Sequence, residues 1–269
     1  AMTPGRFAIV GAGLAGLACA RRLSAAGHAV RIFDKSRAPG GRIATRRGEQ
    51  ASWDHGAQYF TVATPAFRAV VDAASQAGQV ATWTPRWPGG EQEQRALWVG
   101  VPGISALPRW LAQGMDLELG ARVVALERAG AGWALRDDTG RRFDGFDFVV
   151  LALPAPQAAA LAAGHGSVAQ RLEAVGMAPC WAVMLAFERP VEAPLDADFS
   201  TDPVLPWIAR NSAKPRRSGL DAWVLHAGAD WSREREEAEA AAVIAELLER
   251  FAARLSARLP PVAVAQAHR

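Results

Sequence analysis

Three glycines near the start of the chain have the spacing of a phosphate-binding turn. Gly11, Gly13 and Gly16 follow the short apolar run 7–10 and form the pattern G-x-G-x-x-G. The first glycine allows a tight turn, the second lets a pyrophosphate approach the backbone, and the third lets the next helix pack closely on the strand. Such a turn binds anions through free N–H groups and the positive end of the helix dipole.

An acid and a second glycine cluster follow at the distance that a dinucleotide site requires. Asp34 ends the next apolar run, 28–33, where its carboxylate can accept hydrogen bonds from a ribose diol. Gly40, Gly41 and Arg42 come shortly after it, and bare amides beside a guanidinium form a second anion-binding surface. Asp34 suits the ribose of either NAD or FAD, but an NAD domain has no evident use for this second surface.

The elements around these residues form a complete strand-helix-strand unit. Residues 7–10 are too few for a helix and predict a buried parallel strand. Residues 14–26 predict a helix that Gly27 ends, and residues 28–33 predict the second strand. The apolar segment 146–154 predicts another buried strand, which should rejoin the same sheet.

The rest of the chain predicts short strands, tight turns and amphipathic helices. Helices are predicted over 65–78, 104–114 and 243–255, with an interrupted helical stretch over 155–176. Strands are predicted within 80–101, 117–136, 180–187, 207–211 and 222–227, the last two joined by a basic loop that contains Pro215.

Composition and charge exclude several classes of function. The chain has 269 residues and a net charge of +3, but its arginines are spread among acids, so no role with nucleic acid is predicted. It has no Ser/His/Asp or Cys/His set and no metal-ligand cluster. Cys19 and Cys180 form no C-x-x-C pair, and no apolar run is long enough to span a membrane, so we expect a cytoplasmic protein without a membrane partner.

Two stretches of the chain closely resemble a known family. Residues 34–42 and residues 54–61, which read Asp-His-Gly-Ala-Gln-Tyr-Phe-Thr, resemble bacterial renalase-like proteins, FAD oxidoreductases related to the flavin amine oxidases. The resemblance implies that the first glycines and Arg42 hold the FAD pyrophosphate, that residues 56–59 pass the flavin ring, and that Val124 or a neighbour contacts the adenine. The cofactor-binding residues implied are Gly11, Gly13, Leu14, Ala15, Gly16, Asp34, Lys35, Gly41, Arg42, Gly56, Ala57, Gln58 and Val124.

The resemblance also implies a substrate side of the flavin, lined by the segment 96–103. The candidate substrate residues are Tyr59, Phe60, Thr61, Trp98, Val99, Asn211 and His226. For the aromatic residues, the alternative interpretation is ordinary core packing. Asn211 and His226 stand at the ends of apolar strands, where they could reach a pocket or serve as satisfied groups at the edge of a sheet.

These observations predict an α/β fold in which a Rossmann-like FAD-binding domain of the glutathione-reductase type is interleaved with an α+β substrate domain on a mainly antiparallel sheet. The expected FAD-binding domain comprises residues 1–60 and 100–156. The expected substrate domain comprises residues 61–99 and 157–265.

The resemblance implies that the flavin N5 accepts a hydride and that the electrons pass to dioxygen, giving hydrogen peroxide, so no catalytic side chain is assigned. The implied substrates are 2- or 6-dihydro isomers of NAD(P)H. The alternatives are a flavin amine oxidase, an NAD(P)-dependent dehydrogenase and an inactive nucleotide-binding module.

Proteins that resemble this chain continue after the prolines at 260–261 with a final strand and a helix over the flavin. We therefore expect the C-terminal closing segment to be absent, so that the strand around Val149 lacks a neighbour. Either the chain is part of a longer protein, or it binds FAD weakly.

Overall fold

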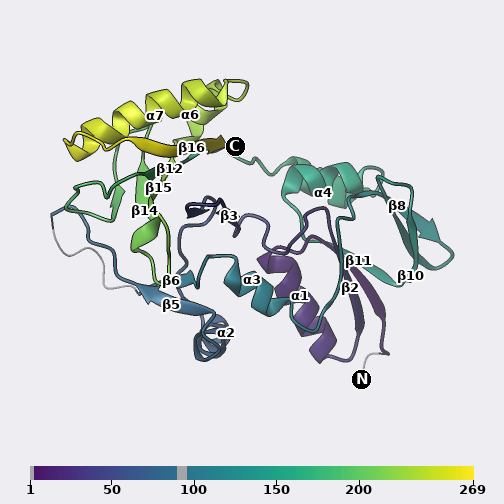
Figure 1. Ribbon diagram of the computed structural model, residues 1–269. Coiled ribbons are helices and arrows are strands. Elements are labelled where there is room, and N and C mark those ends of the chain that lie inside the picture. The colour runs from purple at the N-terminus through teal and green to yellow at the C-terminus, as the bar shows by residue number, and fades with distance from the viewer. Residues whose placement is uncertain (1–2, 90–95) are drawn as a thin grey trace. The chain divides into compact units, whose positions relative to one another are not determined.

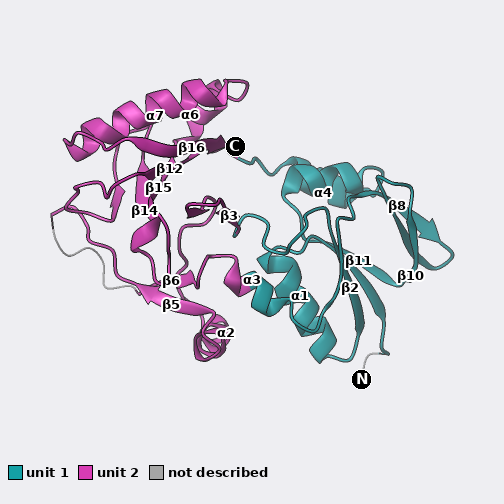
Figure 2. Cartoon of the chain, in the orientation of Figure 1, with its two compact units in different colours: residues 1–43, 108–177 teal, residues 44–107, 178–269 magenta. Residues whose placement is uncertain are grey.

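The computed structural model describes residues 3–89 and 96–269 of the chain (Figure 1). These residues form two compact units (Figure 2). Unit 1 comprises residues 1–43 and 108–177, and unit 2 comprises residues 44–107 and 178–269. These divisions differ from the expected domain boundaries at 60, 100 and 156: residues 44–60 and 100–107 pack with unit 2, and residues 157–177 pack with unit 1.

Unit 1 is built on a four-stranded parallel sheet with the order β11-β1-β2-β7. Its strands are β1 (Arg6–Val10), β2 (Ala29–Asp34), β7 (Asp116–Leu119) and β11 (Phe148–Leu151), and helix α1 (Leu14–Ala25) connects β1 to β2. The predicted strand-helix-strand unit is confirmed, and so is the return of the segment near residue 150 to this sheet.

A smaller antiparallel sheet and two helices complete unit 1. The sheet has the order β10-β9-β8, and its strands are β8 (Val123–Ala129), β9 (Gly132–Asp137) and β10 (Arg142–Phe146). The helices are α4 (Ala155–Ala162) and α5 (Ser167–Glu173). Val10, Phe33, Leu135 and Phe146 share one apolar cluster, so the two sheets of this unit have a common core.

Unit 2 is built on a five-stranded antiparallel sheet with the order β13-β14-β15-β12-β16. The strands of this sheet are β12 (Ala182–Phe187), β13 (Ala197–Phe199), β14 (Trp207–Arg210), β15 (Asp221–His226) and β16 (Val262–His268). Two hairpins belong to the same unit: β3 (Thr45–Arg47) with β4 (Ser52–Asp54), and β5 (Val80–Trp83) with β6 (Leu97–Gly100). The mainly antiparallel second sheet is therefore confirmed.

Helix α7 (Ala240–Leu255) covers one face of the sheet of unit 2. It buries Val243, Leu247 and Phe251, which join Phe187 and Trp223 of the sheet in the largest apolar cluster. The helical spacing of the apolar residues in this segment predicted this packing. The remaining short elements are α2 (Pro65–Gln76), α3 (Ala106–Leu111), α6 (Ala229–Glu234) and the 3₁₀ turn η1 (Asn211–Ala213).

Several elements differ from the sequence prediction, which did not include β3, β4, β10, β13 or α6. Helix α3 is shorter than the predicted 104–114, because the Ile104 and Ser105 amides donate to side chains instead of entering a helix. Strand β16 was not predicted, and it forms because β12 offers a complete antiparallel partner. In unit 1, β11 lies at the edge of its sheet and the Phe148 side chain is half exposed. No described helix is long and apolar enough to cross a bilayer.

Candidate functional site

In the glycine turn after β1, packing excludes a Cβ at two of the three glycines and leaves the third open. Gly11 has a φ of +113°, and a Cβ there would lie 2.5 Å from the Ala152 carbonyl oxygen. A Cβ on Gly16 would overlap the Gly11 carbonyl oxygen. Around Gly13, by contrast, no described atom beyond its chain neighbours lies within 4 Å of a Cβ position. The turn therefore packs tightly on two sides and presents open backbone at Gly13, as a pyrophosphate requires.

The N-terminus of α1 carries positive charge that no side chain neutralises. Gly13 is the N-cap residue, so there is no side-chain cap, and the first turn contains no acid. The first amides of a helix have no partner within it, and the helix dipole adds positive potential there. This end of α1 can therefore hold an anion.

Asp34 connects the glycine turn to the loop that follows β2. One of its oxygens accepts from the Ala12 amide at 2.7 Å, and the other accepts from the Ser36 amide at 2.8 Å. Each carboxylate oxygen has a further acceptor position. Asp34 therefore positions the backbone of the turn and keeps acceptor capacity for a ribose hydroxyl.

The second glycine cluster lies directly beside the first. The Gly40 amide donates to the Ala12 carbonyl at 3.0 Å, and Gly40 forms a parallel bridge with Gly13. Gly41 has a φ of +55°, and a Cβ on it would lie 3.6 Å from the Gly13 Cα. Arg42 is exposed and bonds no other residue within the described part of the chain. The structure therefore brings the two glycine clusters together.

Val124 lies at a β-bulge, a feature that the sequence did not predict. In the β8-β9 pair, Val123 faces Asp137 and Ala125 faces Arg136, with a register shift between them. The extra residue of a bulge is left out of the ladder, so its backbone groups are open to another partner. The Val124 side chain is 49% exposed. A ligand can therefore contact the Val124 backbone without breaking a hydrogen bond between the strands.

In unit 2, strand β4 ends with a buried carboxylate, Asp54, that the sequence analysis did not assign to the site. Asp54 is fully buried, and one of its oxygens accepts from the Thr45 hydroxyl and from the Ile104 amide. Its other oxygen accepts from Arg217 Nη2 at 2.6 Å and from Lys214 Nζ at 3.3 Å. Burial raises the pKa of this carboxyl, but the Lys214 and Arg217 charges and the hydrogen bonds outweigh burial and hold it below its ordinary value.

Lys214 is the second buried member of this cluster. Its ammonium also donates to Gln58 Oε1 at 3.1 Å and lies 5.3 Å from the centre of the Trp83 ring. Burial lowers the pKa of Lys214 to about 8. The Asp54 charge raises this pKa in part, and the Arg217 charge lowers it further. The predicted basic loop thus turns two of its cations into the interior. One unusual signal was available, since only Lys35 and Lys214 among the 30 basic residues are lysines.

Asn211 and His226 are both held by backbone groups. Asn211 is fully buried; its amide accepts from the Asp54 N–H and donates to the Ser52 carbonyl. His226 Nε2 lies 2.9 Å from the His55 carbonyl, which can only accept, so this nitrogen carries the hydrogen. Burial first, and then the Lys214 charge, lower the pKa of His226 to about 4. His226 is therefore neutral at pH 7.

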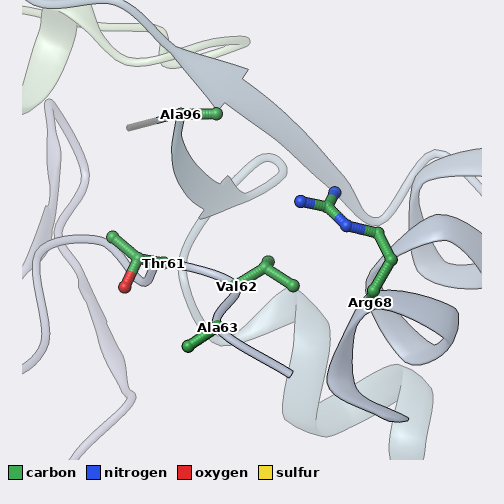
Figure 3. Close-up of a pocket in the computed structure, with 5 residues that line it drawn as sticks. All are labelled: Thr61, Val62, Ala63, Arg68 and Ala96. Atoms are coloured by element: carbon green, nitrogen blue, oxygen red, sulfur yellow. The ribbon is translucent and has the colours of Figure 1, made fainter. Parts of the chain in front are cut away.

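The aromatic candidates of unit 2 are brought together. Phe60 and Trp98 exchange two backbone hydrogen bonds of 2.9 Å, and the Tyr59 ring lies 5.8 Å from that of Trp207. Val99, which follows Trp98 in β6, is fully buried and packs in the core. Next to this bridge is an open pocket of about 330 Å³, into which Arg68 of α2 points its guanidinium (Figure 3). The pocket is lined by Thr61, Val62, Ala63, Arg68 and Ala96.

Two family models match the chain. A family model described as flavin containing amine oxidoreductase matches residues 81–266, more than half of the chain. The chain belongs to this family. A second model, described as an NAD(P)-binding Rossmann-like domain, matches residues 9–74, which include the glycine turn. The predicted cofactor, FAD, and the predicted class, an FAD-dependent oxidoreductase, are confirmed by this membership.

Curated relatives match a short part of the chain. An L-amino-acid oxidase of Demansia vestigiata is 48% identical over 50 residues, which are 19% of this chain and 10% of that protein. A 15-cis-phytoene desaturase of Synechococcus elongatus is 44% identical over 48 residues, 18% of this chain and 10% of that protein. The matches thus span about a tenth of these relatives' length.

Solved structures share the fold over nearly the whole chain. A putrescine oxidase bound to putrescine has a TM-score of 0.73 at 14% identity, covering 98% of this chain and 84% of that one. A putative protoporphyrinogen oxidase from Exiguobacterium sp. 255-15 has a TM-score of 0.75 at 13% identity, covering 100% and 86%. Both likenesses concern the fold alone.

Among the described residues, no group of His, Cys, Asp and Glu could hold a metal ion.

Proposed function

We propose that this protein oxidises a small reduced substrate, a 2- or 6-dihydro isomer of NAD(P)H, with FAD as cofactor, dioxygen as acceptor and hydrogen peroxide as product. The observation that carries the cofactor assignment is the glycine turn. Gly13 offers open backbone, whereas Gly11 and Gly16 are closed by packing. That pattern fits a ligand that lies against the backbone at one point.

The residues of unit 1 fit the nucleotide part of FAD. The uncapped N-terminus of α1 and the amides around Gly41 suit the pyrophosphate, and Arg42 has an unoccupied guanidinium for the same charge. Asp34 has acceptor capacity for a ribose hydroxyl. The open backbone of Val124 suits the edge of an adenine. This donor and acceptor set has a partner for each polar part of the nucleotide.

When bound, FAD supplies the two-electron chemistry, so the side chains need only bind, orient and shield the reactants. The residues of unit 2 are suited to that role. His226 is neutral and His55 holds its ring, while the Phe60–Trp98 bridge fixes the aromatic residues near Tyr59. We therefore assign no side chain to proton transfer.

The substrate proposal rests on the resemblance around residues 58–61 and on the chemistry of this part of unit 2. A dihydronicotinamide nucleotide has a planar ring and phosphates. The half-buried Tyr59 offers aromatic surface, with the buried Trp207 packed behind it, and Arg68 offers a cation beside an open pocket next to Thr61. These groups match both parts of such a substrate.

An amine or amino acid is the second candidate substrate. The family description, and relatives named as L-amino-acid oxidases, favour it. The same aromatic surface near Tyr59 could frame an amine. A charged carboxylate of an amino acid would find its cation in Arg68.

Anaerobic mixing with the FAD-loaded protein separates these candidates. We expect the 2- or 6-dihydro isomers of NAD(P)H to bleach the flavin absorbance faster than ordinary NADH, putrescine or L-amino acids. Rapid bleaching by an amine, with none by the isomers, would establish the second candidate. Acid precipitation should release a yellow supernatant, since no covalent attachment is expected. A colourless protein that takes up no added FAD would refute both.

A further inference from the structure

The buried cluster around Asp54 has an unbalanced charge. It contains one carboxylate, Asp54, and two cations, Lys214 and Arg217, whose side chains are at most 1% exposed. The Asp54–Arg217 contact at 2.6 Å is already a complete ion pair. Lys214 is therefore a second cation that this carboxylate does not need.

The charge on Lys214 costs the fold free energy at neutral pH. Its pKa of about 8 lies below the ordinary 10.5, so the folded state binds its proton more weakly than the unfolded chain does. A buried ammonium in that situation costs free energy, and an apolar side chain of similar length would avoid the cost. Its presence points to a use other than stability.

The contacts of Lys214 identify that use. It is the donor to Gln58 Oε1, while Gln58 Nε2 donates to the Asp54 carbonyl and closes the turn from residue 54 to residue 58. Gln58 is buried, whereas its neighbours Ala57 and Tyr59 are exposed and half-buried. The amide of Gln58 is thus the anchor of this turn, and Lys214 orients that amide.

We propose that Lys214 is a positioning residue: its buried ammonium holds Gln58, and thereby sets the conformation of the segment Gly56–Tyr59 for cofactor and substrate. The inference rests on the proposed function, in which this segment passes the flavin ring. The groups that face the ammonium are Asp54 of β4, Gln58, Arg217, Trp83 of β5 and, through its charge, His226 of β15.

The chain offers an unusually clean test, because Tyr59 is its only tyrosine and Lys35 its only other lysine. Incorporation of 3-fluorotyrosine gives a single ¹⁹F signal from the residue next to Gln58. We expect Lys214→Met to shift or broaden this signal and Lys214→Arg to restore part of it, with and without FAD. The matched control Lys35→Met, at an exposed position, should leave the signal unchanged in the FAD-free protein.

FAD titration gives the functional readout. We expect Lys214→Met to weaken FAD binding about tenfold, with Lys214→Arg between this variant and the wild type. Two results would overturn the positioning role. One is a Tyr59 signal in Lys214→Met that equals the wild-type signal, and the other is an FAD affinity of Lys214→Arg no higher than that of Lys214→Met. If Lys214→Met does not fold, the pH titration of the signal decides: besides the step of the fluorotyrosine phenol itself, the wild type should show a second step from Lys214 that Lys214→Arg lacks, and a single step in both proteins would overturn the proposal.

Failure of the two proposals is distinguishable. If the wild type binds no FAD, the proposed function fails, and the FAD-free ¹⁹F spectra still judge whether Lys214 orders the segment. If the wild type binds and is reduced by its substrate while Lys214→Met has an unchanged spectrum, the positioning role fails alone.

Discussion

The glycine turn of unit 1 is made of backbone, whereas the Asp54 cluster of unit 2 is made of side chains. The turn and its hydrogen-bond partners lie within residues 11–42, and two of its glycines leave no room for a Cβ. The cluster joins residues up to 163 positions apart, and its integrity depends on the balance of buried charges. Substitutions should therefore destabilise the two regions for different reasons. In the turn the reason is steric overlap, and in the cluster it is a buried charge that has lost its partner.

The largest loss of stability is expected from Asp54→Asn. This change leaves Lys214 and Arg217 buried without a carboxylate, and breaking a buried ion pair in this way costs about 3 to 5 kcal/mol. Urea unfolding measures it. The control is Asp230→Asn on the surface of the same unit, where the ion pair with Arg233 is exposed and little change is expected. Similar losses of unfolding free energy in both variants would show that the buried cluster stabilises the fold no more than an exposed ion pair does.

The steric half of the comparison is tested by two glycine-to-alanine changes. Gly16→Ala should cost about 3 kcal/mol or more, because α1 must move away from the Gly11 carbonyl. Gly13→Ala should cost less than about 1 kcal/mol, since its Cβ enters open space. Yet Gly13→Ala should weaken FAD binding at least tenfold by blocking the approach of the pyrophosphate. FAD binding that survives in Gly13→Ala would contradict the assigned role of that backbone.

The pH dependence of stability tests the buried charge of Lys214. Between pH 8 and 10.5 the unfolded chain binds more protons at this residue than the folded chain does, so the unfolding free energy should rise with pH. The contribution is about 2 to 3 kcal/mol across this interval. It appears as the difference between the wild type and Lys214→Met, with Lys35→Met as the control. A difference that stays constant over the interval would show an ordinary lysine pKa.

The smallest effect on the fold, and a selective one on the cofactor, is expected from Arg42→Ala. The guanidinium has no partner among the described residues, so the unfolding free energy should not change. Loss of its contact to the pyrophosphate should weaken FAD binding by about 1.5 to 3 kcal/mol. Arg46→Ala is the comparison variant, since Arg46 bonds Gln266 instead. Equal FAD affinities in the two variants would refute the role of Arg42.

The parts of the fold that depend on local spacing could be predicted. The β1-α1-β2 unit, the two glycine clusters and helix α7 follow from turns and from apolar periodicity, which act over a few residues. Strand β16 could not be predicted, because its alternating small residues need the partner β12. The bulge at Val124 likewise depends on the register of β8 against β9.

The sequence by itself determined the proposed nucleotide site of unit 1, because the absence of three Cβ atoms and the position of one acid dictate where an anion can approach the backbone. The tertiary structure alone decided which charges are buried in unit 2. Lys214 and Arg217 follow one another closely in a basic loop, and lysine and arginine side chains are ordinarily exposed to solvent. They turn inward because Asp54, Gln58 and the Gly100 carbonyl, all distant in sequence, supply the acceptors that make burial of a cation possible.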